Sequence, residues 1–225
     1  MRRAVVLLSG GMDSATTLAV AVSEGYECHA LSVRYGQRHA EEIERSIALA
    51  QALAAASHRI VDADLAFAGG SVLTDPSREV PRRRLDEVAS GGIPTTYVPA
   101  RNTVLLALAL ALAESIGSRD LFIGANAVDY SGYPDCRPEF LSAFEELANV
   151  ATRAGLSGDS FRVHAPLLRE TKGGIVRRAL ALGVDLRITI SCYDPKPGGR
   201  QCGTCDACLL REKGFREAGV VDPAP

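Results

Sequence analysis

The sequence has no long run of apolar residues and no strong excess of one charge. Its longest apolar block, Val104 to Ala113, is shorter than the roughly 20 residues that a helix needs to cross a bilayer. The formal net charge of −2 gives no general electrostatic reason to bind nucleic acid or a membrane surface. The apolar stretch after Met1 is too short for a signal peptide. We therefore expect a cytoplasmic protein without direct contacts to membranes or nucleic acids.

Two common phosphate-binding motifs are also missing. Lysine occurs only at Lys172, Lys196 and Lys213, so the first glycine turn is not followed by the Gly-Lys-Ser/Thr of a Walker loop. The dinucleotide-binding fingerprint needs three spaced glycines, whereas this turn offers only Gly10 and Gly11. The turn therefore belongs to neither of these classes.

What the sequence does contain is a strand, a glycine turn and a helix in succession. The apolar run Ala4 to Leu8 predicts a strand, and apolar residues at helical spacing after Ser14 predict a helix. Between them, Ser-Gly-Gly-Met-Asp-Ser at 9–14 offers glycine backbone and two hydroxyl groups to an anion at a helix N-terminus. The Asp13 carboxylate would repel a phosphate unless a cation such as Mg²⁺ lay between them.

Further alternation of strands and helices predicts an α/β domain with a parallel sheet. Strands are expected at 27–33, 58–61, 120–124 and 161–163, and helices around 43–54, 104–116, from 138, and at 171–182. Gly173 and Gly174 should weaken the start of the last helix. The segment 69–96 is rich in glycine and proline and lacks periodicity, which is typical of a mobile lid or a disordered excursion. Its three arginines at 82–84 indicate a solvated surface or a phosphate clamp.

Four of the six cysteines lie close together near the end of the chain. Their spacing, two overlapping C-x-x-C pairs with a fourth cysteine ten residues upstream, predicts a structural zinc site that has no open position. An iron–sulfur cluster is the main rival, because thiolates serve it equally well. A redox C-x-x-C would leave two of these cysteines unexplained. The predicted ligands are Cys192, Cys202, Cys205 and Cys208.

The first loop resembles the SGGxDS loop of the PP-loop ATP pyrophosphatases. Taken in order, SGGMDS, YGQRH, VPARN, NAVDYSGYPDCRPEF, SCY and CGTCDAC resemble the 7-cyano-7-deazaguanine synthase family of the queuosine pathway. The resemblance runs from Val5 to about Pro223. It implies a homodimer with a Rossmann-like fold of the adenine-nucleotide alpha-hydrolase type, which spans 1–185 with a flexible loop at 69–96, and a small zinc-binding segment at 186–225.

The resemblance also implies the reaction and its residues. The family converts 7-carboxy-7-deazaguanine and ammonia to the nitrile and splits ATP to AMP and pyrophosphate. The expected catalytic residues are Asp13, Ser14 and Lys172. Further residues expected at ATP are Leu8, Ser9, Gly10, Gly11, Met12, Leu18, Ser32, Tyr35 and Gln37. Those expected at the acceptor are Arg101, Asn102, Asn126, Asp129, Tyr130 and Arg137.

Other functions remain open at this point. A PP-loop enzyme that thiolates tRNA would use the same adenylation but needs a persulfide-carrying cysteine, and only Cys28 and Cys136 are spare. A zinc-ribbon binding module would normally have a basic, aromatic-rich surround, which this tail lacks. A related enzyme that attaches the deazaguanine to a protein is a further alternative that the sequence does not exclude.

Overall fold

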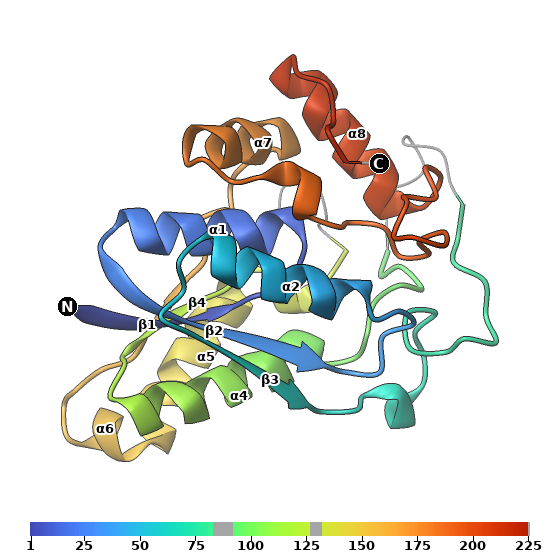
Figure 1. The fold of residues 1–225 in the computed structure, drawn as a ribbon. Helices are drawn as coiled ribbons and strands as arrows, with labels where there is room; N and C mark the ends of the chain where they lie inside the picture. The colour runs from blue at the N-terminus through green and yellow to red at the C-terminus, as the bar shows by residue number, and fades with distance from the viewer. Residues whose placement is uncertain (83–91, 127–131, 225) are drawn as a thin grey trace.

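The computed structural model describes residues 1–82, 92–126 and 132–224. In this part of the chain a five-stranded sheet has the order β3-β2-β1-β4-β5 (Figure 1). The strands are β1 (Arg2–Leu7), β2 (Tyr26–Arg34), β3 (Ser57–Asp62), β4 (Asp120–Phe122) and β5 (Arg162–His164). Every neighbouring pair is parallel, which confirms the predicted α/β fold with a parallel sheet.

Helices cover both faces of the sheet because its central strand is apolar on both sides. Ala4 and Val6 of β1 face a core shared with α1 (Met12–Ser23), α2 (Glu41–Ala52) and α7 (Lys172–Ala181). Val5 and Leu7 face the opposite core, which is shared with α4 (Arg101–Ile116) and α5 (Pro138–Ala151) (Figure 1). Shorter elements are α6 (Arg153–Leu156), η1 (Ala66–Ala68), η2 (Pro134–Cys136) and η3 (Leu186–Ile188).

The order of the strands reverses beside β1. The chain first builds outward through β2 and β3, and then returns to place β4 on the other side of β1. Leu7 is consequently paired with Leu31 of β2, while Val6 is paired with Phe122 of β4. The loops that follow β1, β2 and β4 therefore meet at one edge, where open parallel sheets bind their ligands.

A helix that the sequence did not predict, α8 (Asp206–Ala218), packs against α7 (Figure 1). The approach is so close that a Cβ on Gly173 would lie 2.6 Å from Glu217 Cβ. Helix α7 nevertheless begins at Lys172, because the hydroxyl of Thr171 caps it by accepting a hydrogen bond of 3.1 Å from the Gly174 N–H. The glycines expected to weaken this helix thus allow the contact with α8.

Part of the predicted lid is packed rather than free. Residues 71–74 are buried, and Val72 and Leu73 belong to the core beneath α4. Val80 packs against the cysteine cluster. These stretches are therefore packed against the rest of the described chain, and residues 83–91 lie outside the described ones. Within the described residues, no helix is both long and apolar enough to span a membrane.

Candidate functional site

The glycine turn after β1 is held in one conformation by its own serines. Gly10 has a φ of +88°, and a Cβ there would lie 2.2 Å from the carbonyl oxygen of Glu42, so only glycine fits. The Ser9 N–H donates to Ser14 Oγ at 3.1 Å, and that hydroxyl donates to the Gly11 carbonyl at 3.0 Å. The first N–H groups of α1, which have no partners within the helix, are thereby presented at the sheet edge as an anion site.

Two of the residues predicted at ATP support the turn from beneath. The buried hydroxyl of Ser32 donates to the carbonyl of Leu8 at 2.5 Å and lies 2.8 Å from His58 Nε2. Leu18 is fully buried in the core on the α1 face. These residues brace the turn and do not line the cavity in front of it.

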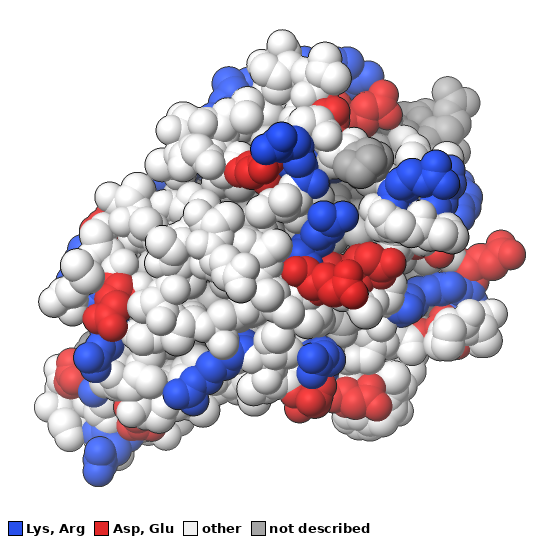
Figure 2. All heavy atoms as spheres, in the orientation of Figure 1, with Lys and Arg blue, Asp and Glu red and all other residues white. Residues whose placement is uncertain are grey.

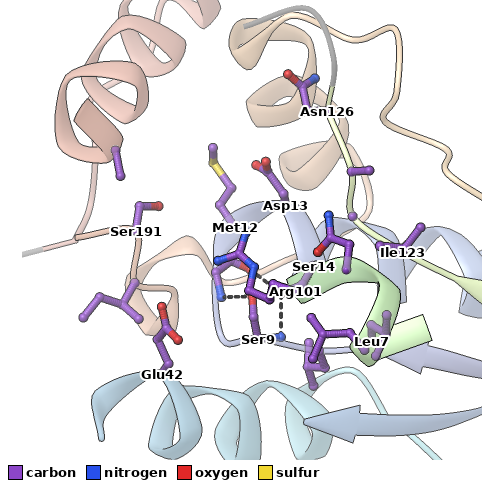
Figure 3. Close-up of a pocket in the computed structure, with 18 of the residues that line it drawn as sticks. Leu7, Ser9, Met12, Asp13, Ser14, Glu42, Arg101, Ile123, Asn126 and Ser191 are labelled. Carbon is purple, nitrogen blue, oxygen red and sulfur yellow. Dashed lines mark hydrogen bonds between the residues drawn. The ribbon is translucent and has the colours of Figure 1, made fainter. Parts of the chain in front are cut away.

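A cavity of about 280 Å³ opens above the turn, beyond the ends of β1, β2 and β4 (Figure 3). Its volume is close to the lower end of the range for small-molecule sites. Predicted ATP and catalytic residues in its wall are Leu8, Ser9, Gly11, Met12, Asp13, Ser14, Tyr35, Gln37 and Lys172. Predicted acceptor residues in its wall are Arg101, Asn102 and Asn126.

Asp13 and Lys172, which are 159 positions apart in sequence, meet across the cavity mouth. Lys172 Nζ donates to Asp13 Oδ2 at 2.5 Å, so α1 and α7 each supply one charge. The segment before Lys172 is held by Asn126, whose side-chain amide donates to the carbonyls of Leu167 (3.0 Å) and Glu170 (2.6 Å). Asn126 therefore positions the lysine as well as lining the cavity.

At the opposite wall, the Arg101 guanidinium lies between two phenol rings, 5.6 Å from the centroid of Tyr35 and 5.9 Å from that of Tyr133. Burial raises the pKa of Tyr35 and of Glu42, and raises that of the Cys136 thiol to about 11. For Glu42 the nearby His39 and Arg101 and a hydrogen bond from Gln37 oppose this rise in pKa only partly. This wall is aromatic and weakly solvated, as expected where a flat heterocycle binds.

The remaining predicted acceptor residues behave differently. The backbone N–H of Asn102 donates to Asp135 Oδ2 at 3.0 Å, and its side-chain amide donates to the Asp135 carbonyl at 2.8 Å. These hydrogen bonds fix η2 against α4. Arg137 is exposed at the N-cap of α5 and does not line the cavity. Asp129 and Tyr130 lie outside the described residues.

The four clustered cysteines are buried, and their sulfur atoms all lie within 4.8 Å of one another. Backbone N–H groups of Cys202 and Asp194 donate to Cys192 Sγ at 3.2 and 3.3 Å, and those of Thr204 and Cys205 donate to Cys202 Sγ at 3.4 and 3.3 Å. Such bonds stabilise thiolates, so the set fits a dication with four sulfur ligands. The first residue of the arginine run, Arg82, donates to Asp194 at 2.8 Å beside this cluster.

Several residues of the cavity wall had no role in the sequence interpretation: Glu42, Tyr133, Ser191, Tyr193 and Arg211. Ser191 and Tyr193 flank the predicted metal ligand in the Ser-Cys-Tyr motif, so that motif was the available signal. Arg211 had none. Its buried guanidinium donates to Asp222 at 2.6 and 2.9 Å, to Thr189 Oγ1 at 2.8 Å and to the Leu186 carbonyl at 3.1 Å.

Figure 2 shows acidic and basic side chains interspersed on the face that it draws, without one broad basic field. Helix α2, which carries Glu41, Glu42 and Glu44 in its first turn, begins beside the cavity.

Comparisons with known proteins agree with this arrangement. The chain is 60% identical over 222 residues to a 7-cyano-7-deazaguanine synthase of Cupriavidus taiwanensis, covering 99% of this chain and 96% of the relative. It is 62% identical to a synthase of the same name from Anaeromyxobacter sp., with 99% and 95% covered. A solved structure described as a predicted subunit of tRNA methyltransferase from Methanocaldococcus jannaschii shares the fold, with a TM-score of 0.51, 15% identity, and 99% and 90% covered.

The family model described as "Queuosine biosynthesis protein QueC" matches residues 3–219, which include the glycine turn, the whole described cavity wall and all four clustered cysteines. The chain therefore belongs to the QueC family of queuosine biosynthesis proteins.

Proposed function

We propose that this protein converts 7-carboxy-7-deazaguanine and ammonia to 7-cyano-7-deazaguanine, with cleavage of ATP to AMP and pyrophosphate. The observation that carries the proposal is 60% identity across 99% of the chain to a relative named for this product. A cavity that joins an anion-binding turn to an aromatic, arginine-containing wall supports it, because the reaction needs ATP and a flat acidic heterocycle side by side.

The chemistry requires two activations at one site. A carboxylate does not release oxide to ammonia, so its oxygen first attacks the α-phosphorus to give an acyl-adenylate and pyrophosphate. Ammonia then displaces AMP and yields the amide. A second ATP adenylates the amide oxygen, and loss of AMP gives the nitrile. The protein contributes mainly position and electrostatic stabilisation.

In this proposal the turn at 9–14 and the N-terminus of α1 hold the pyrophosphate, while Tyr35 and Gln37 lie near adenine and ribose. Asp13 would hold Mg²⁺ together with the phosphates, and Lys172 would exchange its bond to Asp13 for a phosphate oxygen. When bound, the metal neutralises phosphate charge and stabilises the departing pyrophosphate. Arg101, with Asp129 and Tyr130, serves the acceptor, whereas Asn102 and Asn126 act chiefly by positioning.

We propose further that Cys192, Cys202, Cys205 and Cys208 hold one structural zinc ion. Four thiolate ligands leave no open position for chemistry. The site would instead fix Ser191 and Tyr193 in the cavity wall on either side of one ligand. We also propose that residues 1–185 form one domain and that residues 186–225 form a zinc-binding segment. The protein is further proposed to be a homodimer located in the cytoplasm.

The test is mass spectrometry of the small-molecule product after incubation with 7-carboxy-7-deazaguanine, Mg-ATP and ammonium. We expect the mass of the nitrile only when all three are present, together with AMP. If only a tRNA or a protein acquires the acyl group, the proposal is wrong.

A further inference from the structure

The nitrogen atom enters the proposed reaction as ammonia and leaves as a nitrile, so it must lose three protons. One proton is lost when ammonia displaces AMP, and two are lost as the amide becomes the nitrile. Attack of the acid on ATP needs no such help, because that carboxylate is already ionised at neutral pH. A base is therefore needed at the nitrogen but not at the first adenylation.

Glu42 is placed to meet that nitrogen. It lies in the first turn of α2, and its backbone carbonyl is packed directly against Gly10 of the anion-binding turn. Its side chain lines the same cavity, and Figure 3 shows the carboxylate extending upward from α2, below Ser191 and beside Ser9 in this view. A carbonyl carbon joined through oxygen to a phosphorus held by the turn would therefore lie in the cavity that this carboxylate lines.

The other titratable groups in the described wall fit the task less well. Asp13 is paired with Lys172 at 2.5 Å, and its oxygens are needed for the cation. The pKa of Tyr35 and that of Cys136 are raised by burial, so both stay protonated at neutral pH. No histidine lines the described part of the cavity. Glu42 is thus the remaining carboxylate of this wall.

The surroundings of Glu42 suit a base rather than a permanent ion pair. It is faced by Tyr35 after β2, by His39 and Gln37 in the loop before α2, and by Arg101 of α4. Burial raises its pKa above the usual range of a glutamate, and the neighbouring His39 and Arg101 oppose the rise. A base works best when its pKa is near the working pH.

We propose that Glu42 is the catalytic residue that accepts protons from the nitrogen in amide and nitrile formation; this inference rests on the proposed function. In the first round the nitrogen–carbon bond forms, the carbon–oxygen bond breaks with its electron pair leaving on AMP, and the proton passes to Glu42. In the second round the amide oxygen bonds to the α-phosphorus as pyrophosphate leaves with the electron pair of the broken phosphorus–oxygen bond, and the amide nitrogen loses one proton. The nitrogen loses its other proton as the carbon–oxygen bond breaks and AMP leaves. Glu42 returns each proton to solvent before it accepts the next.

The experiment separates adenylation from nitrogen chemistry in the full-length protein. Exchange of labelled pyrophosphate into ATP, measured in the presence of 7-carboxy-7-deazaguanine, reports adenylation of the acid. Mass spectrometry measures the amide and the nitrile. For Glu42→Gln we expect exchange within about threefold of the unchanged protein, but amide formation lowered by about 10²- to 10⁴-fold, the usual contribution of a positioned base. Glu44→Gln, at an exposed position on the same helix, is the matched control and should change neither.

Each outcome decides the matter. Exchange retained with the amide lost, together with loss of the acidic limb of the pH–rate profile, supports the role of Glu42. Amide formed at the normal rate by Glu42→Gln overturns it, and so does a defect confined to the KM for ATP, which would make Glu42 a ribose ligand. Should Glu42→Gln not fold, Glu42→Asp must retain exchange and slow amide formation. If the unchanged protein makes no amide or nitrile, the proposed function fails instead.

Discussion

Asp222→Asn tests how much the buried ion pair between Arg211 and Asp222 stabilises the C-terminal segment against the cavity wall. Arg211 is only 1% exposed, and its guanidinium donates two hydrogen bonds to its ion-pair partner Asp222, whose side chain is 23% exposed. The same guanidinium holds Thr189 and, at 3.4 Å, the hydroxyl of Ser191 in the wall. The substitution keeps the shape of residue 222 but leaves a buried cation without its counter-charge.

Removing one partner of a fully buried pair costs about 3–5 kcal/mol. Because water reaches part of Asp222, we expect a loss of about 2–3 kcal/mol in the free energy of unfolding, or about 5–10 °C in melting temperature for a chain of this length. Asp62→Asn is the matched control, since its pair with Arg34 is 75% and 53% exposed and should contribute less than about 1 kcal/mol.

The pH dependence gives an independent check. Burial alone would raise the pKa of Asp222, but the bonds from Arg211 outweigh it and hold that pKa below its ordinary value. The stability from this pair is therefore present at neutral pH and is lost as the pH falls below about 4 through the lowered pKa. Thermal unfolding followed by circular dichroism should show the melting temperatures of the unchanged protein and of Asp222→Asn converging below about pH 4. Equal melting temperatures for Asp222→Asn and Asp62→Asn at pH 7 would refute this reasoning.

Three further outcomes are expected. Gly10→Ala should abolish ATP binding measured by calorimetry, because Gly10 has a φ of +88° and an added Cβ would lie 2.2 Å from the carbonyl oxygen of Glu42. The control Gly25→Ala, with a φ of +82° but open space around it, should bind ATP normally. Equal affinities of the two variants for ATP would contradict the account. Asp13→Asn and Lys172→Met should lower turnover by at least about 10²-fold while circular dichroism shows a folded protein, since each removes one charge at the phosphates. Elemental analysis should find about one zinc per chain, and Cys205→Ser should lower the melting temperature more than it alters KM; iron with labile sulfide would contradict this.

The strands could be predicted from the sequence because apolar runs such as Ala4 to Leu8 report burial directly. The glycine turn and the cysteine cluster could also be predicted, since residues close in sequence carry them. Glu42 and Arg211 could not, because their roles arise only when distant elements pack together. Asn102 and Asn126 were expected at the acceptor. The side-chain amides of both also donate hydrogen bonds to backbone carbonyls, which only the tertiary structure reveals.

The central claim is that one site activates two oxygens in turn, and the ratio of AMP to nitrile tests it most directly. With 7-carboxy-7-deazaguanine as substrate we expect about two AMP for each nitrile, and with the corresponding amide supplied instead about one, since each carbon–oxygen bond needs its own adenylation. Both activities should disappear together in Asp13→Asn. One AMP per turnover with the amide as final product, or ADP in place of AMP, would contradict the account.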